Sequence, residues 1–278
     1  MDRYFIIGDP VAHSISPCIH GELFSRYGIR ASYEPVRVRR GDVKAFLAFS
    51  RERYRGGNVT IPHKEEAARC VDHLDEGATF SGAVNTVVLR EGDLWGYNTD
   101  GPGFVLSVRE EVGHFLYKDV VIFGGGGAVR GILPSLAGEG VGKVPLVVRS
   151  PEKVRGLINV FSEKFKDVHI GVEEWGSVEA TSAVASADLV VNATSLGLEE
   201  EFLDFPSEEV KKGALVVDIV YRKGGTRIAR ECERKGIDFL DGLAMLAGQA
   251  LYAFEIWTGV RPDYPLVREI ARACLSKK

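Results

Sequence analysis

A lysine follows a short apolar strand in the segment GNVTIPHK, residues 57–64. Pro62 suits the start of a helix, because the N–H that proline lacks would have no intrahelical partner there. Lys64 would then lie at a helix N-terminus, where the helix dipole disfavours a cation. Such a lysine is either an ordinary surface charge or a group that donates and accepts protons in a reaction.

Three other polar segments favour the second interpretation, because each lies where a strand-like run begins or ends. They are HSISP at residues 13–17, GAVNT at 82–86 and GYNTDG at 96–101. Each alone is an ordinary turn or helix start. If residues 13–17 are extended, the hydroxyls of Ser14 and Ser16 point the same way. Together with Lys64, these segments supply a carboxylate, amides and hydroxyls, a set that suits a small polyhydroxylated acid.

In these segments the chain resembles the shikimate dehydrogenase family. Its residues match family motifs at 13–20, 57–64, 82–86 and 96–103, and the resemblance continues at 192–197 and 242–249. It therefore covers essentially the whole chain. The resemblance implies an NADP-dependent oxidoreductase that reversibly reduces 3-dehydroshikimate to shikimate, in the biosynthesis of chorismate and the aromatic amino acids.

The resemblance also implies roles for particular residues. Lys64 and Asp100 would be the catalytic acid–base pair, because hydride transfer to a carbonyl leaves an alkoxide that must be protonated. The Asp100 carboxylate favours the charged lysine, whereas the helix N-terminus opposes it. The implied substrate-binding residues are Ser14 and Ser16 for the carboxylate, Thr60, Asn85 and Gln249 for the ring hydroxyls, and Tyr221 near the nicotinamide and the carboxylate.

Strand-like and helical runs alternate along most of the chain, which predicts an α/β fold with mostly parallel sheets. A local hairpin, Thr86–Arg90 with Asp93–Tyr97, interrupts the alternation. Predicted strands are Tyr4–Gly8, Ala31–Val38, Gly57–Thr60, Asp119–Phe123, Lys143–Val148, Leu189–Asn192 and Ala214–Ile219, and predicted helices include Ile19–Tyr27, Val43–Arg53 and Ile228–Lys235. The resemblance implies two domains: a discontinuous substrate domain (1–101 and 241–278) and an inserted Rossmann-type NADP-binding domain (102–240).

A buried strand at 120–123 runs into four glycines and then a helix, an arrangement typical of dinucleotide binding. The strict G-x-G-x-x-G spacing is not met, because Val129 occupies the third glycine position; Arg130 instead completes the family variant GxGGAxR. The candidate cofactor-binding residues, some implied only by the resemblance, are Gly124, Gly125, Gly126, Gly127, Ala128, Arg149, Ser150, Lys153, Asn192, Thr194, Ser195, Gly242 and Met245.

The end of the second strand of this domain predicts NADP rather than NAD. An acidic residue there takes the ribose 2′-hydroxyl of NAD, whereas an arginine accommodates a 2′-phosphate. Arg149 is the first charged residue after Val144–Val148, although the asparagine of the family's NRT triplet is replaced by Val148. A second departure is Lys223 in place of the usual proline after Tyr221, from which we expect a more mobile loop.

Bulk properties exclude several classes of partner. With 278 residues, 45% of them hydrophobic, a net charge of −4 and a pI near 5.9, the chain has no electrostatic case for binding nucleic acid or an anionic membrane. No apolar run approaches the ~18 residues of a transmembrane helix. The N-terminus lacks a signal-peptide layout. We expect a cytoplasmic protein with a small-molecule substrate, and the resemblance is compatible with a homodimer.

The four cysteines, Cys18, Cys70, Cys232 and Cys274, form no C-x-x-C pair. We expect free, mostly buried thiols, as in a reducing cytosol, with Cys18 a core residue. The six histidines show neither H-x-x-x-H nor H-E-x-x-H spacing. We therefore expect no metal site.

Two alternative functions stay open, and a third class is excluded by its motifs. A quinate or dual quinate/shikimate dehydrogenase needs room for an extra substrate hydroxyl, and Ser14 with Ser16 fits the shikimate pattern better. A non-catalytic dinucleotide sensor has no need of both Lys64 and Asp100. Folate methylene dehydrogenases share the two-domain plan but lack the substrate motifs.

Overall fold

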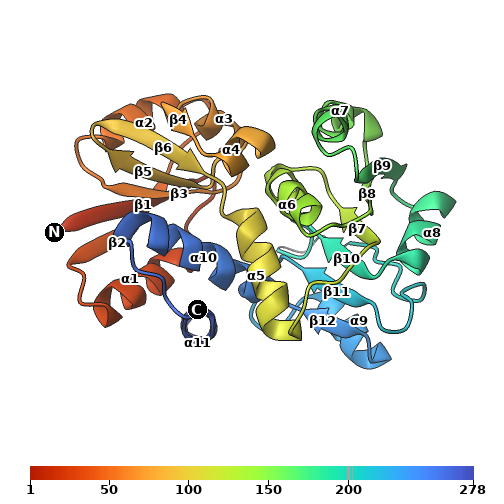
Figure 1. Cartoon of the computed structure of the whole chain (residues 1–278). Helices are drawn as coiled ribbons and strands as arrows, with labels where there is room; N and C mark the ends of the chain where they lie inside the picture. The colour runs from red at the N-terminus through yellow and green to blue at the C-terminus, as the bar shows by residue number, and fades with distance from the viewer. Residues whose placement is uncertain (199–200, 202) are drawn as a thin grey trace. The chain divides into compact units, whose positions relative to one another are not determined.

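The computed structural model describes residues 1–198, 201 and 203–278. The chain divides into two compact units, residues 1–104 with 247–278, and residues 105–246. The two boundaries fall inside helices, α5 (Asp100–Val112) and α10 (Gly242–Thr258). In Figure 1 the colours show that the first unit combines both ends of the chain.

The first unit has a mixed six-stranded sheet in the order β2-β1-β3-β5-β6-β4. The first three of these strands are parallel, and β5 pairs antiparallel with both β3 and β6. The hairpin predicted at β5 and β6 is confirmed. The strands are β1 (Asp2–Gly8), β2 (Ala31–Arg37), β3 (Gly56–Val59), β4 (His73–Leu74), β5 (Thr86–Arg90) and β6 (Asp93–Tyr97).

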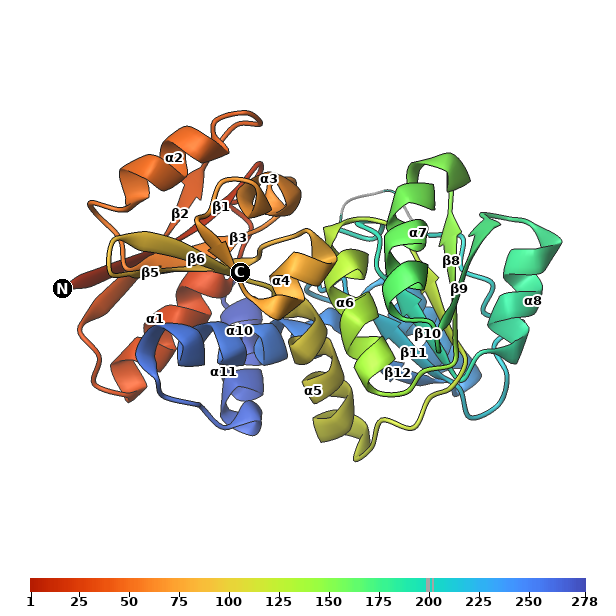
Figure 2. The ribbon, with the colours of Figure 1, turned by 45° about the horizontal axis from the view of Figure 1, so that its top comes forward.

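Helices cover both faces of this sheet. Figures 1 and 2 show α1, α10 and α11 on one face, and α2 and α3 on the other. On the α2 side, Phe5 and Val59 of the strands pack against Leu47. The helices of this unit besides α5 and α10 are α1 (Ser16–Arg26), α2 (Val43–Ser50), α3 (Lys64–Ala68), α4 (Glu76–Ser81) and α11 (Tyr264–Ser276).

The second unit has a six-stranded sheet in the order β12-β11-β10-β7-β8-β9, and its described strands pair in parallel throughout. This is the 3-2-1-4-5-6 order of a dinucleotide-binding fold, with its topological switch between β7 and β10. The strands are β7 (Val120–Phe123), β8 (Lys143–Val148), β9 (His169–Glu174), β10 (Leu189–Asn192), β11 (Leu215–Asp218) and β12 (Asp238–Leu240).

Burial on both faces explains the composition of the central strands. The sequences VVIF of β7, LVVN of β10 and LVVD of β11 are buried at every position. Continuous apolar runs of this kind are typical of parallel sheets covered on both faces. The elements that connect or cover the strands are α6 (Gly127–Gly138), a 3₁₀ turn η1 (Pro151–Lys153), α7 (Arg155–Lys164), α8 (Val178–Ser186) and α9 (Arg227–Lys235).

All seven strand segments predicted from the sequence are strands in the structure, with ends that differ by a residue or two. The last strand, β12, and the edge strands β4 and β9 were not among them. These strands are short or alternate weakly, so their pairing depends on neighbours rather than on local pattern. In the part of the chain that the structure describes, no helix is both long and apolar enough to cross a membrane.

A histidine is enclosed by aromatic rings between α1 and α10. The ring of His20 lies 4.8 Å from that of Tyr33 and 4.9 Å from that of Trp257, centroid to centroid. The residue is fully buried, and among the described residues neither ring nitrogen has a hydrogen-bond partner. Burial lowers the pKa of His20 from 6.5 to about 3, because the charged imidazolium loses its hydration.

This buried histidine makes stability depend on pH. Below pH 6.5 the unfolded chain binds a proton at His20 that the folded protein does not bind until about pH 3, so stability falls as the pH falls through this window. Between pH 7 and pH 5, the wild type should lose about 2 kcal/mol more unfolding free energy than His20→Phe. Urea denaturation at several pH values measures this difference, and equal pH slopes would contradict it.

Candidate active site

Two helix starts bring Lys64 and Asp100 together. Lys64 is the first residue of α3, which follows β3, and Asp100 is the first residue of α5, which follows β6. Their ion pair has an Nζ–Oδ2 distance of 2.5 Å, and the side chains are only 14% and 6% exposed. The pair expected from the sequence is therefore a contact in the folded chain, sheltered from water but still reachable through the lysine.

Asp100 has one further donor on its carboxylate and one contact through its backbone. The Asn85 amide donates to its Oδ1 at 2.7 Å, and the backbone N–H of Asp100 donates to the side chain of Asn98 at 3.0 Å. The position of Asp100 in the first turn of a 13-residue helix also favours an anion. Lys64, in contrast, opens a helix of only five residues. The helix start therefore suits the charge of Asp100 but not that of Lys64.

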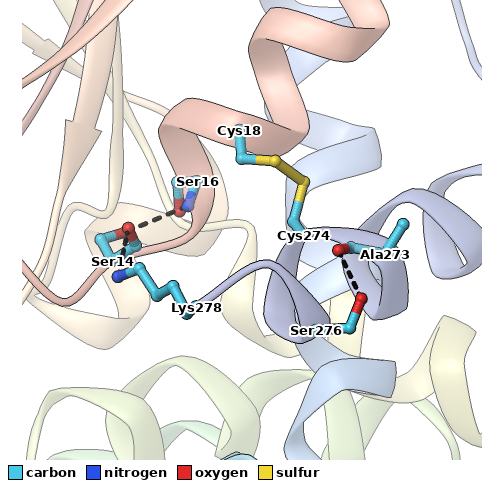
Figure 3. The surroundings of a disulfide bond; sticks show 7 residues. All are labelled: Ser14, Ser16, Cys18, Ala273, Cys274, Ser276 and Lys278. Atoms are coloured by element: carbon cyan, nitrogen blue, oxygen red, sulfur yellow. Dashed lines mark hydrogen bonds between the residues drawn. A yellow bond between two sulfur atoms is a disulfide. The ribbon is translucent and has the colours of Figure 1, made fainter.

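The segment that contains Ser14 and Ser16 is not extended, so the condition under which their hydroxyls would point the same way is not met. Ile15 between them has helical angles (φ −96°, ψ −1°), and the hydroxyl of Ser14 accepts a hydrogen bond from the backbone N–H of Ser16 at 3.2 Å. The segment is the start of α1, the ordinary reading of its sequence, because a serine hydroxyl at the start of a helix competes well for free backbone donors. Figure 3 shows this contact beside the end of the chain.

The expectation of four free thiols is also wrong. Cys18 of α1 and Cys274 of α11 form a disulfide, with their Cα atoms 5.9 Å apart (Figure 3). Cys18 is exposed rather than a core residue, whereas Cys70 and Cys232 remain free thiols. The reason is the packing of α1 on α11, which joins cysteines 256 positions apart in the sequence. The ammonium of Lys278, just beyond α11, donates to the Ser14 carbonyl at 3.1 Å.

Gln249 is placed by a close crossing of α5 and α10. A Cβ atom on Gly103 would lie 2.4 Å from the backbone nitrogen of Gln249, and one on Gly248 would lie 2.2 Å from the carbonyl oxygen of Gly103. Glycine at both positions lets the two backbones touch. Gln249 therefore lies beside the helix that begins with Asp100, and it is half-buried. Thr60, at the end of β3, is half-buried too.

In the second unit, the glycine-rich turn lies at the switch point of the sheet. Gly124 has φ +118°, and a Cβ on it would lie 2.9 Å from the carbonyl oxygen of Ala193 at the end of β10. Gly126 is the N-cap of α6, with open space where its side chain would be. Gly127 and Ala128 begin the helix, so their backbone N–H groups belong to its free first turn. This geometry suits a pyrophosphate.

The cationic residues predicted for the cofactor lie at the neighbouring strand end. Arg149 and Ser150 follow β8, and Lys153 ends the 3₁₀ turn. Arg149 and Lys153 are exposed, and Ser150 is half-buried. Because β7 and β8 are adjacent and parallel, these side chains come from the same edge of the sheet as the glycines. A Cβ atom on Gly125 would lie 2.3 Å from Cγ1 of Val154, beyond the turn, so glycine is needed for this close packing.

A buried aspartate, which was not among the residues predicted from the sequence, organises the next two strand ends. Asp218 of β11 accepts hydrogen bonds from Asn192 at 2.8 Å, from the backbone of Val220 at 3.1 Å and from Thr226 at 2.7 Å. Burial raises its pKa, because the carboxylate loses hydration. Its only sequence signal was a charged residue ending an otherwise apolar strand.

The side chain of Asn192 consequently makes its hydrogen bonds within the protein and does not point to solvent. It is fully buried; its amide bonds Asp218, and its oxygen accepts from the backbone and hydroxyl of Thr194 at 3.1 and 2.7 Å. Thr194 is half-buried and Ser195 is exposed in the turn that these contacts shape. The remaining candidates in this unit are Tyr221 (half-buried), Gly242 at the start of α10 and Met245 (buried).

Comparisons with known proteins show the family to which the chain is similar. Residues 6–87 match the family model described as the shikimate dehydrogenase substrate binding domain. Residues 242–272 match that of the shikimate 5'-dehydrogenase C-terminal domain. A shikimate dehydrogenase (NADP(+)) of Symbiobacterium thermophilum is 38% identical over 274 residues, which cover 97% of this chain and 93% of that protein.

Solved structures show the same fold. The shikimate 5-dehydrogenase of Thermus thermophilus, in complex with NADP(H) and shikimate, has a TM-score of 0.87 and 35% identity, over 99% of this chain and 100% of that one. The quinate dehydrogenase of Corynebacterium glutamicum, in complex with NAD, has a TM-score of 0.88 and 28% identity, over 98% and 99% of the two chains.

The helix crossing gives a test of the site's framework. Gly248→Ala should destabilise the protein by about 1–3 kcal/mol, because its methyl group meets the backbone of α5. Gly21→Ala in α1 is the matched control: a Cβ added there would have nothing within 4 Å, so it should stabilise the helix by up to ~1 kcal/mol. Urea unfolding followed by circular dichroism measures both. Equal effects of the two substitutions would argue against a tight crossing.

Proposed function

The chain belongs to the shikimate dehydrogenase family, and we propose that it is an NADP-dependent shikimate dehydrogenase, which interconverts 3-dehydroshikimate and shikimate. The observation that carries the proposal is the Lys64–Asp100 ion pair, 2.5 Å long and nearly buried, with Asn85 on the second carboxylate oxygen. The family membership and the NADP-dependent relative support the same activity.

The pair accounts for the proton that the reaction needs. Reduction of the ketone leaves an oxygen that must take up a proton, and the Lys64 ammonium is the donor placed to give it. Asp100 holds the lysine in one orientation, and Asn85 holds Asp100. In the reverse direction Lys64 accepts the proton from the shikimate hydroxyl.

We assign substrate binding to the first unit. Ser14 and Ser16 would hold the carboxylate, since hydrogen bonds to a charged acceptor are about twice as strong as neutral ones. Thr60, Asn85 and Gln249 would hold the ring hydroxyls. These residues offer donors and acceptors of the kind that a polyhydroxylated ring requires, at helix starts and strand ends of one unit.

We assign the cofactor to the second unit, whose residues fit it. The open N-terminus of α6 would hold the pyrophosphate, and Arg149 with Ser150 would hold the 2′-phosphate. Thr194, Ser195, Tyr221 and Met245 would border the ribose and nicotinamide, on turns that Asn192 and Asp218 shape. When bound, NADPH supplies the hydride.

Quinate is the second candidate substrate, because the structural similarity extends to a quinate dehydrogenase. An assay of shikimate or quinate against NADP or NAD, followed by absorbance of the reduced cofactor, separates the two. We expect the highest kcat/KM for shikimate with NADP. A preference for quinate, or no activity with any pair, would refute the proposal.

Removal of the acid should stop the chemistry but not binding. Lys64→Ala should lower kcat by at least ~10²-fold, the usual scale for a general acid, with a much smaller change in KM. Asp100→Asn should resemble it, and the double variant should be little worse than either single one. Lys44→Ala, which removes an exposed lysine of α2, is the control. Near-normal turnover of Lys64→Ala would exclude Lys64 as the acid.

Cofactor choice should depend on Arg149. Arg149→Ala should weaken NADP binding by roughly 10–100-fold, the effect of one lost charged hydrogen-bonding group, and leave NAD binding nearly unchanged. Arg234→Ala, at an exposed position of α9, should change neither affinity. Fluorescence titration with each cofactor measures the effect. Equal losses for both cofactors would disprove a role for Arg149 at the 2′-phosphate.

A further inference from the structure

A line of buried polar side chains runs from β2 to the ion pair. It joins Tyr33, Asn58, Thr86 and Asn85, and each of them is at most 9% exposed. Resting on the proposed function, we propose that Tyr33, Asn58 and Thr86 are positioning residues for the reaction: they fix the orientation of Asn85, and through it that of the Asp100 carboxylate beside Lys64.

A backbone contact identifies which end of the Asn85 amide is the oxygen. The N–H of Thr99 donates to Asn85 Oδ1 at 2.8 Å, so this atom is the oxygen. The Nδ2 group therefore faces Asp100 and donates to its Oδ1 at 2.7 Å. If the amide were reversed, its oxygen would face the carboxylate, two acceptors would meet, and Asp100 would lose a donor. The catalytic carboxylate thus depends on this one amide orientation.

Thr86 supports that orientation from the neighbouring strand position. Its hydroxyl accepts from Asn58 Nδ2 at 3.0 Å and lies 3.0 Å from Asn85 Oδ1, to which it donates. An amide oxygen can only accept, so Thr86 supplies the proton of this bond; its hydroxyl also lies 3.4 Å from that of Thr99. Asn58 and Thr86 are directly opposite each other in the antiparallel pairing of β3 with β5.

Asn58 is oriented in the same way by a backbone group. Its Nδ2 donates to the carbonyl oxygen of Asn85 at 3.0 Å, and a carbonyl can only accept. Its Oδ1 must therefore accept, and it receives the Tyr33 hydroxyl at 2.7 Å. Because β1 lies between β2 and β3, only a long side chain can make this contact across two strand spacings, each about 4.8 Å.

In every hydrogen bond of the line, the donor is therefore on the Tyr33 side. Tyr33 donates to Asn58, Asn58 to Thr86, Thr86 to Asn85, and Asn85 to Asp100. Burial raises the pKa of Tyr33 well above 10, so its hydroxyl keeps the proton that it donates. A merely structural role would require only that each buried group be satisfied. A positioning role requires in addition that the loss of an interior link, far from substrate, lower turnover through Asn85.

The test uses a matched pair at the middle of the line. Thr86→Val removes the hydroxyl with little change of shape, and Thr86→Ser keeps the hydroxyl. Thr86→Val should lower kcat about tenfold with KM changed less than ~3-fold, the effect of one lost hydrogen bond on the transition state, and Thr86→Ser should restore most of it. Tyr33→Phe should lower kcat less, and should add nothing in the Thr86→Val background.

Tyr54→Phe is the control for loss of a phenol, since its hydroxyl donates to Glu34 outside this line. Normal kcat for Thr86→Val, a failure of Thr86→Ser to restore it, or additive losses in the double variant would overturn the inference while leaving the proposed function intact. Circular dichroism on each variant checks that it is folded. Absence of shikimate oxidation by the wild type itself would overturn both.

Discussion

A charged pair removed from water is stable only if each charge keeps partners that replace its hydration. The Lys64–Asp100 pair meets this requirement on the aspartate side, with Asn85 on one oxygen, Lys64 on the other and a helix N-terminus beneath. β3, β5 and β6 deliver the lysine, the amide and the carboxylate to one region, since two helices begin where their strands end.

The second unit also brings strand ends together, but in a sheet whose described strands are all parallel. Its parallel strands end at one edge, where Gly124 allows the ends of β7 and β10 to approach closely. Asp218 then ties the ends of β10 and β11 together through Asn192 and Thr226. The three donors replace the hydration that the buried carboxylate loses, so Asp218 fixes the two turns from within the sheet.

The disulfide ties the first loop to the other end of the chain. Free thiols would leave α1 and α11 joined only by packing, whereas the Cys18–Cys274 bond connects them covalently near the Ser14–Ser16 turn. Lys278 reaches the carbonyl of Ser14 from the same side. The segment assigned to the substrate carboxylate is therefore held from the C-terminal end of the chain as well as by its own helix.

Local pattern in the sequence was enough to predict most of the strands, the hairpin and the glycine-rich turn, because strand burial and turn chemistry depend on a few neighbouring residues. The family resemblance pointed to Lys64, Asp100 and Asn85, and the structure brings these three side chains into contact. Local pattern was not enough to find the Cys18–Cys274 bond, the aromatic enclosure of His20, the role of Asp218 or the orientation of Asn85 by Thr86 and Asn58. Each of these depends on contacts between segments distant in the chain. Only the tertiary structure decided which polar groups met, because a buried donor takes whatever acceptor the packing brings to it.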